Sequence, residues 1–278
     1  MKTSLQARTA PLSFSKSAAA SDGEQLLAKL ARTGLVARGV VYGVIGALSI
    51  GLATGAGGKT TSQTGALKTI AHQPLGTVAL IALTIGLAGY AAWRLVEGVS
   101  GFGGGETASA GHRASAVISG IAYAVLCAIA IEILAGSSPS SGGARQATAG
   151  VLGWPGGPVY VAIAGVLLLG AGAYQAYKGI ARKFCEDSQV QRMSAETRRT
   201  FTVLGTVGYC ARGVTFLLIG YGLIKAAVDY SPKSAVGLDG ALQELIHASY
   251  GPLLLGIVAA GFLAFALFSI ADARYHRV

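Results

Sequence analysis

The sequence predicts an all-α, polytopic membrane protein. Its six transmembrane helices form three parallel two-helix repeats around a pseudo-threefold axis along the membrane normal. Three observations predict this fold. Only 12% of the 278 residues are charged and 52% are hydrophobic, whereas soluble domains carry roughly 25% charged residues. Six long apolar stretches follow one another, and motifs of the first recur in later ones. This composition excludes a disordered chain and a disulfide scaffold.

Each of the six apolar stretches is long enough to cross a bilayer, whose core of about 30 Å requires roughly 20 helical residues. Few charges interrupt them, and none has the alternating pattern of a transmembrane β-strand. The connections between them are short, so we expect no sizeable soluble domain. The predicted spans are residues 33–54, 75–97, 114–135, 158–180, 202–228 and 251–272.

Residues 1–29 form a predicted cytoplasmic tail. Residues 1–20 contain three basic residues, no acid and no apolar core of a secretory signal. A disordered tail is favoured over an organellar transit peptide, which the composition also permits. Residues 24–31 (EQLLAKLA) have apolar side chains at helical spacing, which predicts a segment lying along the membrane interface.

The distribution of basic residues predicts the orientation of the spans. Of the 22 lysines and arginines, 17 lie on the side that holds the tail, the second and fourth connections and the C-terminus. By the positive-inside rule, both termini are expected in the cytoplasm. The net charge of +10 is then a topology signal, and its partners are anionic lipid headgroups on the cytoplasmic face, not nucleic acid. The other side carries only Lys59, Lys68, Arg145, Lys225 and Lys233.

Motifs of the first span recur in the third and fifth. Residues 34–42 (GLVARGVVY) match residues 208–216 (GYCARGVTF), and residues 116–123 (AVISGIAY) are a weaker copy. Glycines at such positions let helices approach closely. We therefore expect the matched glycines and aromatic residues to pack between helices. They are Gly39, Gly120, Gly213, Tyr42, Tyr123 and Phe216.

The second, fourth and sixth spans repeat as well, each with a glycine followed four positions later by an aromatic residue. Because every unit has two spans, all three units enter the membrane from the same side. We expect repeat 1 at residues 30–101, repeat 2 at 111–184 and repeat 3 at 202–278. The matched residues are Gly86, Gly170, Gly261, Tyr90, Tyr174 and Phe265.

This paired-helix unit, its Ala-Arg-Gly sequence and its threefold repetition resemble a bacterial integral-membrane family with tandem copies of domain of unknown function 1206. The resemblance covers residues 30–278 and is weakest in the second unit. It implies a multi-pass protein of the bacterial plasma (inner) membrane, and it implies no activity.

Two arginines and two acids recur at matched positions of the first and third units. Arg38 and Arg212 lie about 8 Å inside their spans at 1.5 Å per residue, and Glu97 and Asp272 end the following spans at a similar depth. The second unit lacks both charges. This co-occurrence predicts structural ion pairs between Arg38 and Glu97 and between Arg212 and Asp272. Snorkelling of the arginines to headgroups is the alternative. No charge is expected near the midplane.

The repeated aromatic residues predict an interhelical packing layer, with a pore constriction or ligand box as the alternative. His72 and His247 occupy matching places just before the second and sixth spans, each after a short amphipathic run. A plain interfacial role is favoured for both histidines. The more specific alternatives are that the two histidines sense pH or share a metal ion.

No catalytic arrangement is recognisable, since the chain has no GxSxG, HExxH or P-loop motif. We expect no cofactor and no metal. The favoured function is a non-enzymatic membrane protein that acts through helix packing and lipid or partner contacts. A small-solute carrier or channel is the alternative. A membrane enzyme acting on lipid headgroups is a third possibility, with polar groups converging at one leaflet from Arg38, Arg94, Glu97, Lys178, Arg212 and Asp272.

Overall fold

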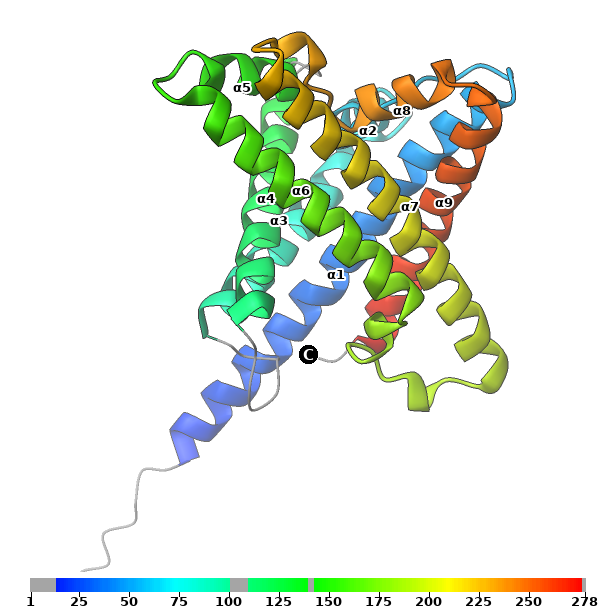
Figure 1. Ribbon diagram of the computed structural model, residues 1–278. Coiled ribbons are helices and arrows are strands. Elements are labelled where there is room, and N and C mark those ends of the chain that lie inside the picture. The colour runs from blue at the N-terminus through cyan, green and yellow to red at the C-terminus, as the bar shows by residue number, and fades with distance from the viewer. Residues whose placement is uncertain (1–13, 101–109, 140–142, 277–278) are drawn as a thin grey trace, which may run out of the picture.

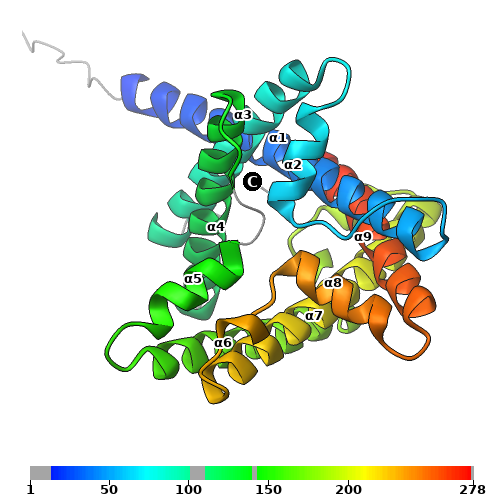
Figure 2. The same cartoon turned by 90° about the horizontal axis from the view of Figure 1, so that it is seen from above.

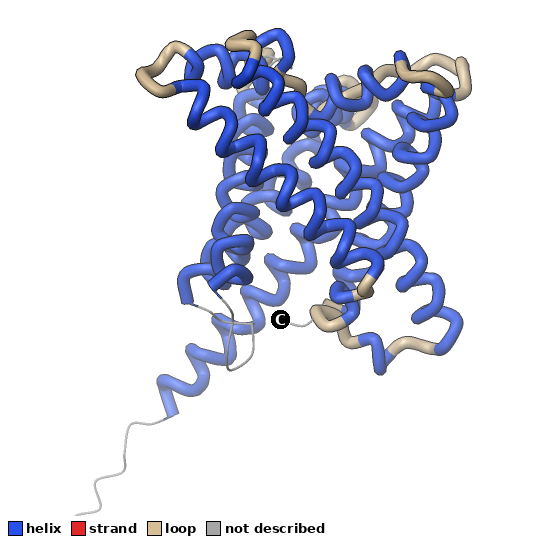
Figure 3. Tube along the Cα trace, in the orientation of Figure 1, coloured by secondary structure: helices blue, strands red, loops and turns tan. Residues whose placement is uncertain are grey.

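The computed structural model describes residues 14–100, 110–139 and 143–276. Across these ranges the chain is helical with short connections, and no strand occurs in them (Figure 3). Short 3-10 turns cover Lys183–Cys185, Val190–Arg192 and Pro232–Ser234. The α-helices are α1 (Phe14–Ala53), α2 (Gln63–Ala71), α3 (Gly76–Ser100), α4 (Ala110–Leu134), α5 (Gly143–Leu152), α6 (Gly157–Ile180), α7 (Ala195–Val228), α8 (Leu238–His247) and α9 (Gly251–Tyr275).

Six of these helices, α1, α3, α4, α6, α7 and α9, are long and apolar enough to cross a membrane, which confirms the predicted spans. The prediction for residues 24–31 needs correction. Residues 24–31 are part of the continuous helix α1 and form no separate interfacial segment (Figure 1). Their Glu, Leu, Ala and Lys residues are strong helix formers and no proline follows them, so the helix has no reason to break. Residues 1–13 lie outside the described residues.

Each repeat consists of a span, a short helix and a second span. The short helices α2, α5 and α8 lie across one end of the bundle, here called the short-helix face (Figure 2). The opposite end, the terminal face, is formed by the connection of residues 181–194 and the end of α9 (Figure 1). Helices α2 and α8 coincide with the short amphipathic runs predicted before the second and sixth spans, whereas α5 was not predicted, because its apolar residues are mostly small.

The same turn leads from each short helix into the following span. The residue before each of Gly76, Gly157 and Gly251 has a positive φ of 62°, 75° and 60°, respectively. A Cβ on any of the three glycines would collide with a backbone carbonyl of the last turn of the short helix. The three units therefore share a glycine-dependent turn that the sequence repeat did not reveal.

The six spans pack mainly between neighbouring units. The most extensive contacts join α1 to α9, α3 to α4 and α6 to α7. Within the first and third units, α1 also packs on α3 and α7 on α9. The second unit is different, because α4 and α6 are not among the packed pairs of the described structure. The ring of helices is therefore open between α4 and α6. The pseudo-threefold axis itself stays a prediction.

The repeated glycines mark these helix contacts. A Cβ on Gly39 would lie 2.9 Å from the carbonyl oxygen of Ala266 in α9, and a Cβ on Gly213 would lie 2.9 Å from that of Gly172 in α6. A Cβ on Gly120 would lie 2.7 Å from the Leu95 side chain in α3. All three positions thus allow the close approach that was predicted for them.

The glycines of the even spans separate the second unit from the other two. Gly86 faces Ala37 of α1, and Gly261 faces Ala211 of α7, so both allow the two helices of their unit to cross closely. Gly170, the matching residue of the second unit, has no atom within 4 Å of its Cβ position. Its predicted packing role is therefore wrong, because its helix α6 does not pack on α4, the other span of its unit.

The sequence of α4 explains this opening. In the other units, Gly34 and Gly208 lie directly against the aromatic residue of the second span, where a Cβ would collide. Each is followed three positions later by an alanine. The aligned residues of α4 are Ser115 and Ile118. Their larger side chains prevent the same close crossing, so α4 stays apart from α6.

Candidate functional site

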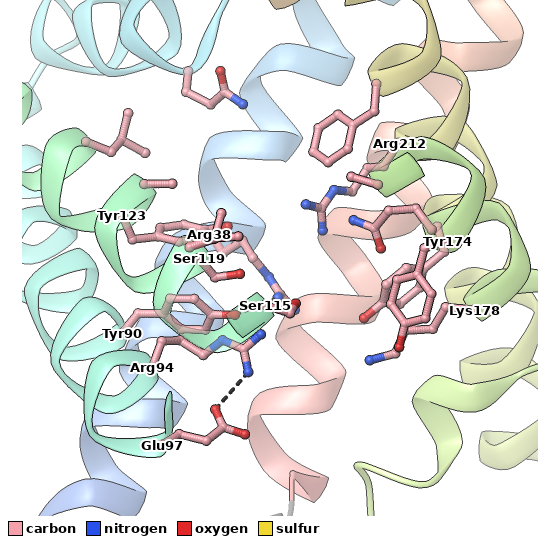
Figure 4. A pocket seen from close by; sticks show the side chains of 18 of the residues that line it. Arg38, Tyr90, Arg94, Glu97, Ser115, Ser119, Tyr123, Tyr174, Lys178 and Arg212 are labelled. Carbon is pink, nitrogen blue, oxygen red and sulfur yellow. Dashed lines mark hydrogen bonds and ion pairs between the residues drawn. The ribbon is translucent and has the colours of Figure 1, made fainter. Parts of the chain in front are cut away.

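A cavity of about 1490 Å³ lies between the spans, and side chains of α4 and α6 are among those that line it (Figure 4). Residues of α1, α3, α4, α6 and α7 line it. It reaches Glu186 and Asp187 at the terminal face, and Gln63 and Thr64 at the short-helix face. A second, smaller cavity of about 50 Å³ adjoins it beside Asp272.

Arg38 crosses from α1 towards the cavity and is held by neutral groups. Its side chain is buried, and its Nε donates to Ser269 Oγ at 3.2 Å while Nη1 donates to Tyr90 Oη at 3.1 Å. The guanidinium also lies 5.0 Å from the ring centroid of Phe265. No carboxylate of the described residues lies within 4 Å of it. These contacts fix the position of the charge, and the carboxylate of Asp272, more than 4 Å away, offsets it only in part.

Arg212 of α7 has fewer hydrogen-bond partners than Arg38. Its guanidinium carbon lies 4.5 to 5.5 Å from the ring centroids of Tyr42, Phe216 and Phe265. Its Nε is buried without a hydrogen-bond partner. Aromatic faces attract a cation, but they leave its N–H groups unpaired. Figure 4 shows the guanidinium pointing into the cavity, so a ligand there could accept its hydrogen bonds.

The other charges of the cavity neutralise one another near the terminal face. Arg94 Nη1 pairs with Glu97 Oε2 at 2.7 Å, and Lys178 Nζ pairs with Asp187 Oδ2 at 2.7 Å. Glu186 pairs outside with the exposed Lys183 at 3.1 Å. After this pairing, the two cations left without a carboxylate partner among the described lining residues are the two central arginines. The middle of the cavity therefore carries excess positive charge.

These contacts correct the predicted ion pairs. Glu97 pairs with Arg94, which precedes it by one helical turn, instead of with Arg38. Asp272 accepts from Ser188 Oγ at 2.6 Å and contacts His276 Nδ1 at 3.3 Å, instead of pairing with Arg212. Neither predicted pair is formed among the described residues. The acids lie at the terminal face and have nearer partners, whereas the arginines point into the bundle.

Both arginines are far from the ends of their helices. Arg38 is 24 residues after the first residue of α1 and 15 before the last. Arg212 is 17 residues after the first residue of α7 and 16 before the last. Both helices also begin before the predicted spans, at residues 14 and 195 instead of 33 and 202. The predicted depth of about 8 Å and the expected absence of charge near the midplane stay predictions.

The connection of residues 181–194 covers the terminal side of the two cavities. Gln189 N donates to the carbonyl of Tyr275 at 2.7 Å, and Ser188 is bonded to Asp272. Phe184 is fully buried, with its ring centroid 5.1 to 6.1 Å from those of Phe201, Tyr209 and Phe268. This connection is therefore anchored to α7 and α9 by both polar and apolar contacts.

The repeated aromatic residues pack together and also line the cavity. Tyr42 lies 5.0 Å from Phe265, and Tyr90 lies 4.5 Å from Tyr123, between ring centroids. Phe216 and Tyr174 line the cavity as well. Tyr174 is 56% exposed, whereas its counterpart Tyr90 is only 4% exposed. The predicted interhelical packing therefore holds for Tyr42 and Tyr90, and the alternative of a ligand box stays a prediction.

The two histidines lie at the short-helix face, away from the cavity lining. His72 caps the C-terminus of α2, and His247 is the last residue of α8. Among the described residues, no group of three histidine, cysteine or acidic side chains could hold a metal ion. Their proposed pH sensing stays a prediction. The cavity residues that sequence reasoning missed are polar residues within spans, Ser115 and Gln175, whose only signal was polarity in an apolar stretch.

Comparison with known proteins gives a family match over most of the chain. The pattern of Domain of Unknown Function (DUF1206) matches three times, at residues 33–101, 114–182 and 207–276. The chain is also 28% identical over 252 residues to "Uncharacterized protein YxxB" of Bacillus subtilis (strain 168), covering 90% of this chain and 91% of that protein. No solved structure matches it.

Proposed function

The chain belongs to the DUF1206 family, with three tandem copies of its domain, and from this premise we propose that it is a non-enzymatic membrane protein that binds an organic anion in its central cavity. The observation that carries this proposal is Arg212, whose guanidinium faces the cavity with an unpartnered Nε. An unpaired cation inside a membrane protein is costly. An anion bound between Arg212 and Arg38 would remove that cost and accept the free N–H groups.

The residue chemistry supports binding over catalysis. Glu97 and Asp187, the acids of the cavity lining that could exchange protons with a ligand, are each held in an ion pair with a basic neighbour. Ser115 and Ser119 of α4 also line the cavity, and Figure 4 shows them on the same side as Arg38. Neither has a base among its hydrogen-bond partners in the described structure. These side chains suit recognition of a polar ligand.

The proposal also includes the orientation of the protein in the membrane and its contacts with lipids. The protein lies in the bacterial inner membrane with both termini in the cytoplasm, because 17 of its 22 basic residues lie on that side. The terminal face is then cytoplasmic, and its basic residues contact anionic headgroups. The exposed Arg198 and Arg199 at the start of α7 are suitably placed for such contacts.

A small-solute carrier is the second candidate function. The observation that favours it is the length of the cavity, which is lined by residues of both faces of the bundle. A carrier must expose its binding site alternately to each side of the membrane. Uptake of labelled benzoate into liposomes that contain the protein would support the carrier function. Binding without uptake would restrict the function to binding.

Calorimetric titration of the purified protein with benzoate and with inorganic phosphate tests anion binding. We expect at least one of these anions to bind the wild-type protein about ten- to a hundredfold more tightly than Arg212→Ala, since a hydrogen bond to a charged group contributes about 1.5–3 kcal/mol. Lys225→Ala, which removes an exposed cation of the same helix, is the matched control. Equal binding by all three proteins, or no binding of either anion, would refute the proposal.

A further inference from the structure

The cavity opens sideways between α4 and α6. Lining side chains on the two sides of this gap are largely exposed: Ile118 of α4 is 67% exposed and Tyr174 of α6 is 56% exposed. The two helices do not pack on each other. Since α4 and α6 are both membrane spans, this opening faces the interior of the lipid bilayer. A molecule dissolved in the membrane can therefore reach the arginines without crossing a face of the protein.

The polarity of the cavity changes along its length. The half nearer the terminal face is lined by polar and charged groups, including Ser115, Gln175 and Lys178. Towards the short-helix face, the α4 wall consists of apolar side chains, Leu126 and Ile129 among them, and the polar Gln63 and Thr64 line the very end. Arg38 and Arg212 lie between the two halves. The cavity is thus amphipathic, with its excess positive charge at the boundary.

From the lateral opening and this polarity we infer that the ligand is an amphiphilic anion, which enters from the membrane between α4 and α6. Its carboxylate or phosphate binds Arg38 and Arg212, and its hydrocarbon chain lies against Leu126 and Ile129. Apolar walls gain free energy when a chain displaces water from them. A free small anion would satisfy the arginines but would leave this apolar wall uncovered. The inference rests on the proposed anion-binding function and specifies the class of ligand.

Native mass spectrometry of the purified protein in detergent can separate the contributions of charge and chain. The probes are oleate, which has both, oleyl alcohol, which has the chain alone, and acetate, which has the charge alone. We expect one oleate to be retained per chain, at a concentration about tenfold or more below that required for either of the other probes. Equal retention of oleate and oleyl alcohol would overturn the inference.

Two pairs of variants locate the bound molecule. Ile129→Trp fills the apolar half of the cavity, whereas Ile131→Trp places the same side chain on the exposed side of α4, where residue 131 is 54% exposed. We expect only the first to displace oleate. Arg212→Gln, which keeps a polar side chain, should weaken oleate retention about tenfold or more, and Lys225→Gln, at an exposed position of the same helix, should not. Displacement by Ile131→Trp alone, or a dimer that covers α4 and α6 in place of bound oleate, would contradict the inference.

The outcomes distinguish this inference from the proposed function. Arg212-dependent binding of benzoate or phosphate without any preference for oleate would retain the anion site and refute the amphiphilic ligand. Failure of all the anions to bind would refute both.

Discussion

Replacing Gly86 with alanine tests the close crossing of α1 and α3. An ideal Cβ at this position lies 2.8 Å from the Cβ of Ala37 and 3.0 Å from the carbonyl oxygen of Thr33. Carbon atoms pack at about 3.5–4.0 Å, so the two helices would have to separate by about 0.7 Å. Such overpacking typically costs about 1–3 kcal/mol. The greater helix preference of alanine offsets about 1 kcal/mol of this cost.

The repeat supplies a matched control at Gly170, the equivalent position of the second unit. Its Cβ position has no neighbour within 4 Å, so Gly170→Ala gains the helix preference without the clash. Subtracting the two effects cancels the helix contribution. The free energy of unfolding of Gly86→Ala should therefore be lower than that of Gly170→Ala by about 1–3 kcal/mol, the cost of overpacking alone.

Unfolding of both variants in mixed micelles with increasing denaturing detergent, followed by circular dichroism, measures this difference. Gly261→Ala, the third equivalent, should resemble Gly86→Ala because Gly261 faces Ala211 as closely. Equal stabilities for all three variants would show that α4 and α6 pack like the other pairs. That result would remove the opening on which the site depends.

Three further predictions concern the terminal face and the orientation. Asp272→Asn should increase tryptic cleavage within residues 181–194 about tenfold, since it weakens the 2.6 Å bond from Ser188; unchanged cleavage, as expected for the exposed Glu196→Gln, would argue against this anchor. Phe184→Ala should lower the free energy of unfolding by about 3–5 kcal/mol, because the ring is fully buried, and a loss below 1 kcal/mol in detergent unfolding would contradict its position. Alkaline phosphatase fused after Lys59 should be active in a bacterial host and inactive after the C-terminus; the reverse pattern would invert the proposed orientation.

The spans and the repeat could be predicted because both are recorded locally in the sequence. Apolar length identifies a span, and the shared glycines mark the close contacts between helices. The cyclic packing of neighbouring units was not foreseeable in the same way. It depends on which surfaces meet, as at Gly39 against α9 and Gly120 against α3, and the sequence gives no direct signal of such partners.

The cavity could not be predicted because it results from a contact that is missing. The second unit was recognised as the weakest copy. The effect of Ser115 and Ile118 becomes apparent only in the structure, where their counterparts, Gly34 and the alanine three positions later, lie at a helix crossing. The predicted ion pairs were wrong for a similar reason. Co-occurrence suggested that Arg38 pairs with Glu97, whereas the nearer Arg94 is the partner of that acid.

The central claim is that Arg38 and Arg212 hold an anion inside the bundle. The most direct test is a crystal structure of the protein with 4-bromobenzoate, in which anomalous scattering locates the bromine. We predict a bromine peak within the cavity and carboxylate density in contact with the Arg212 guanidinium. An empty cavity at saturating ligand, or a carboxylate of the chain itself bonded to Arg212, would contradict the claim.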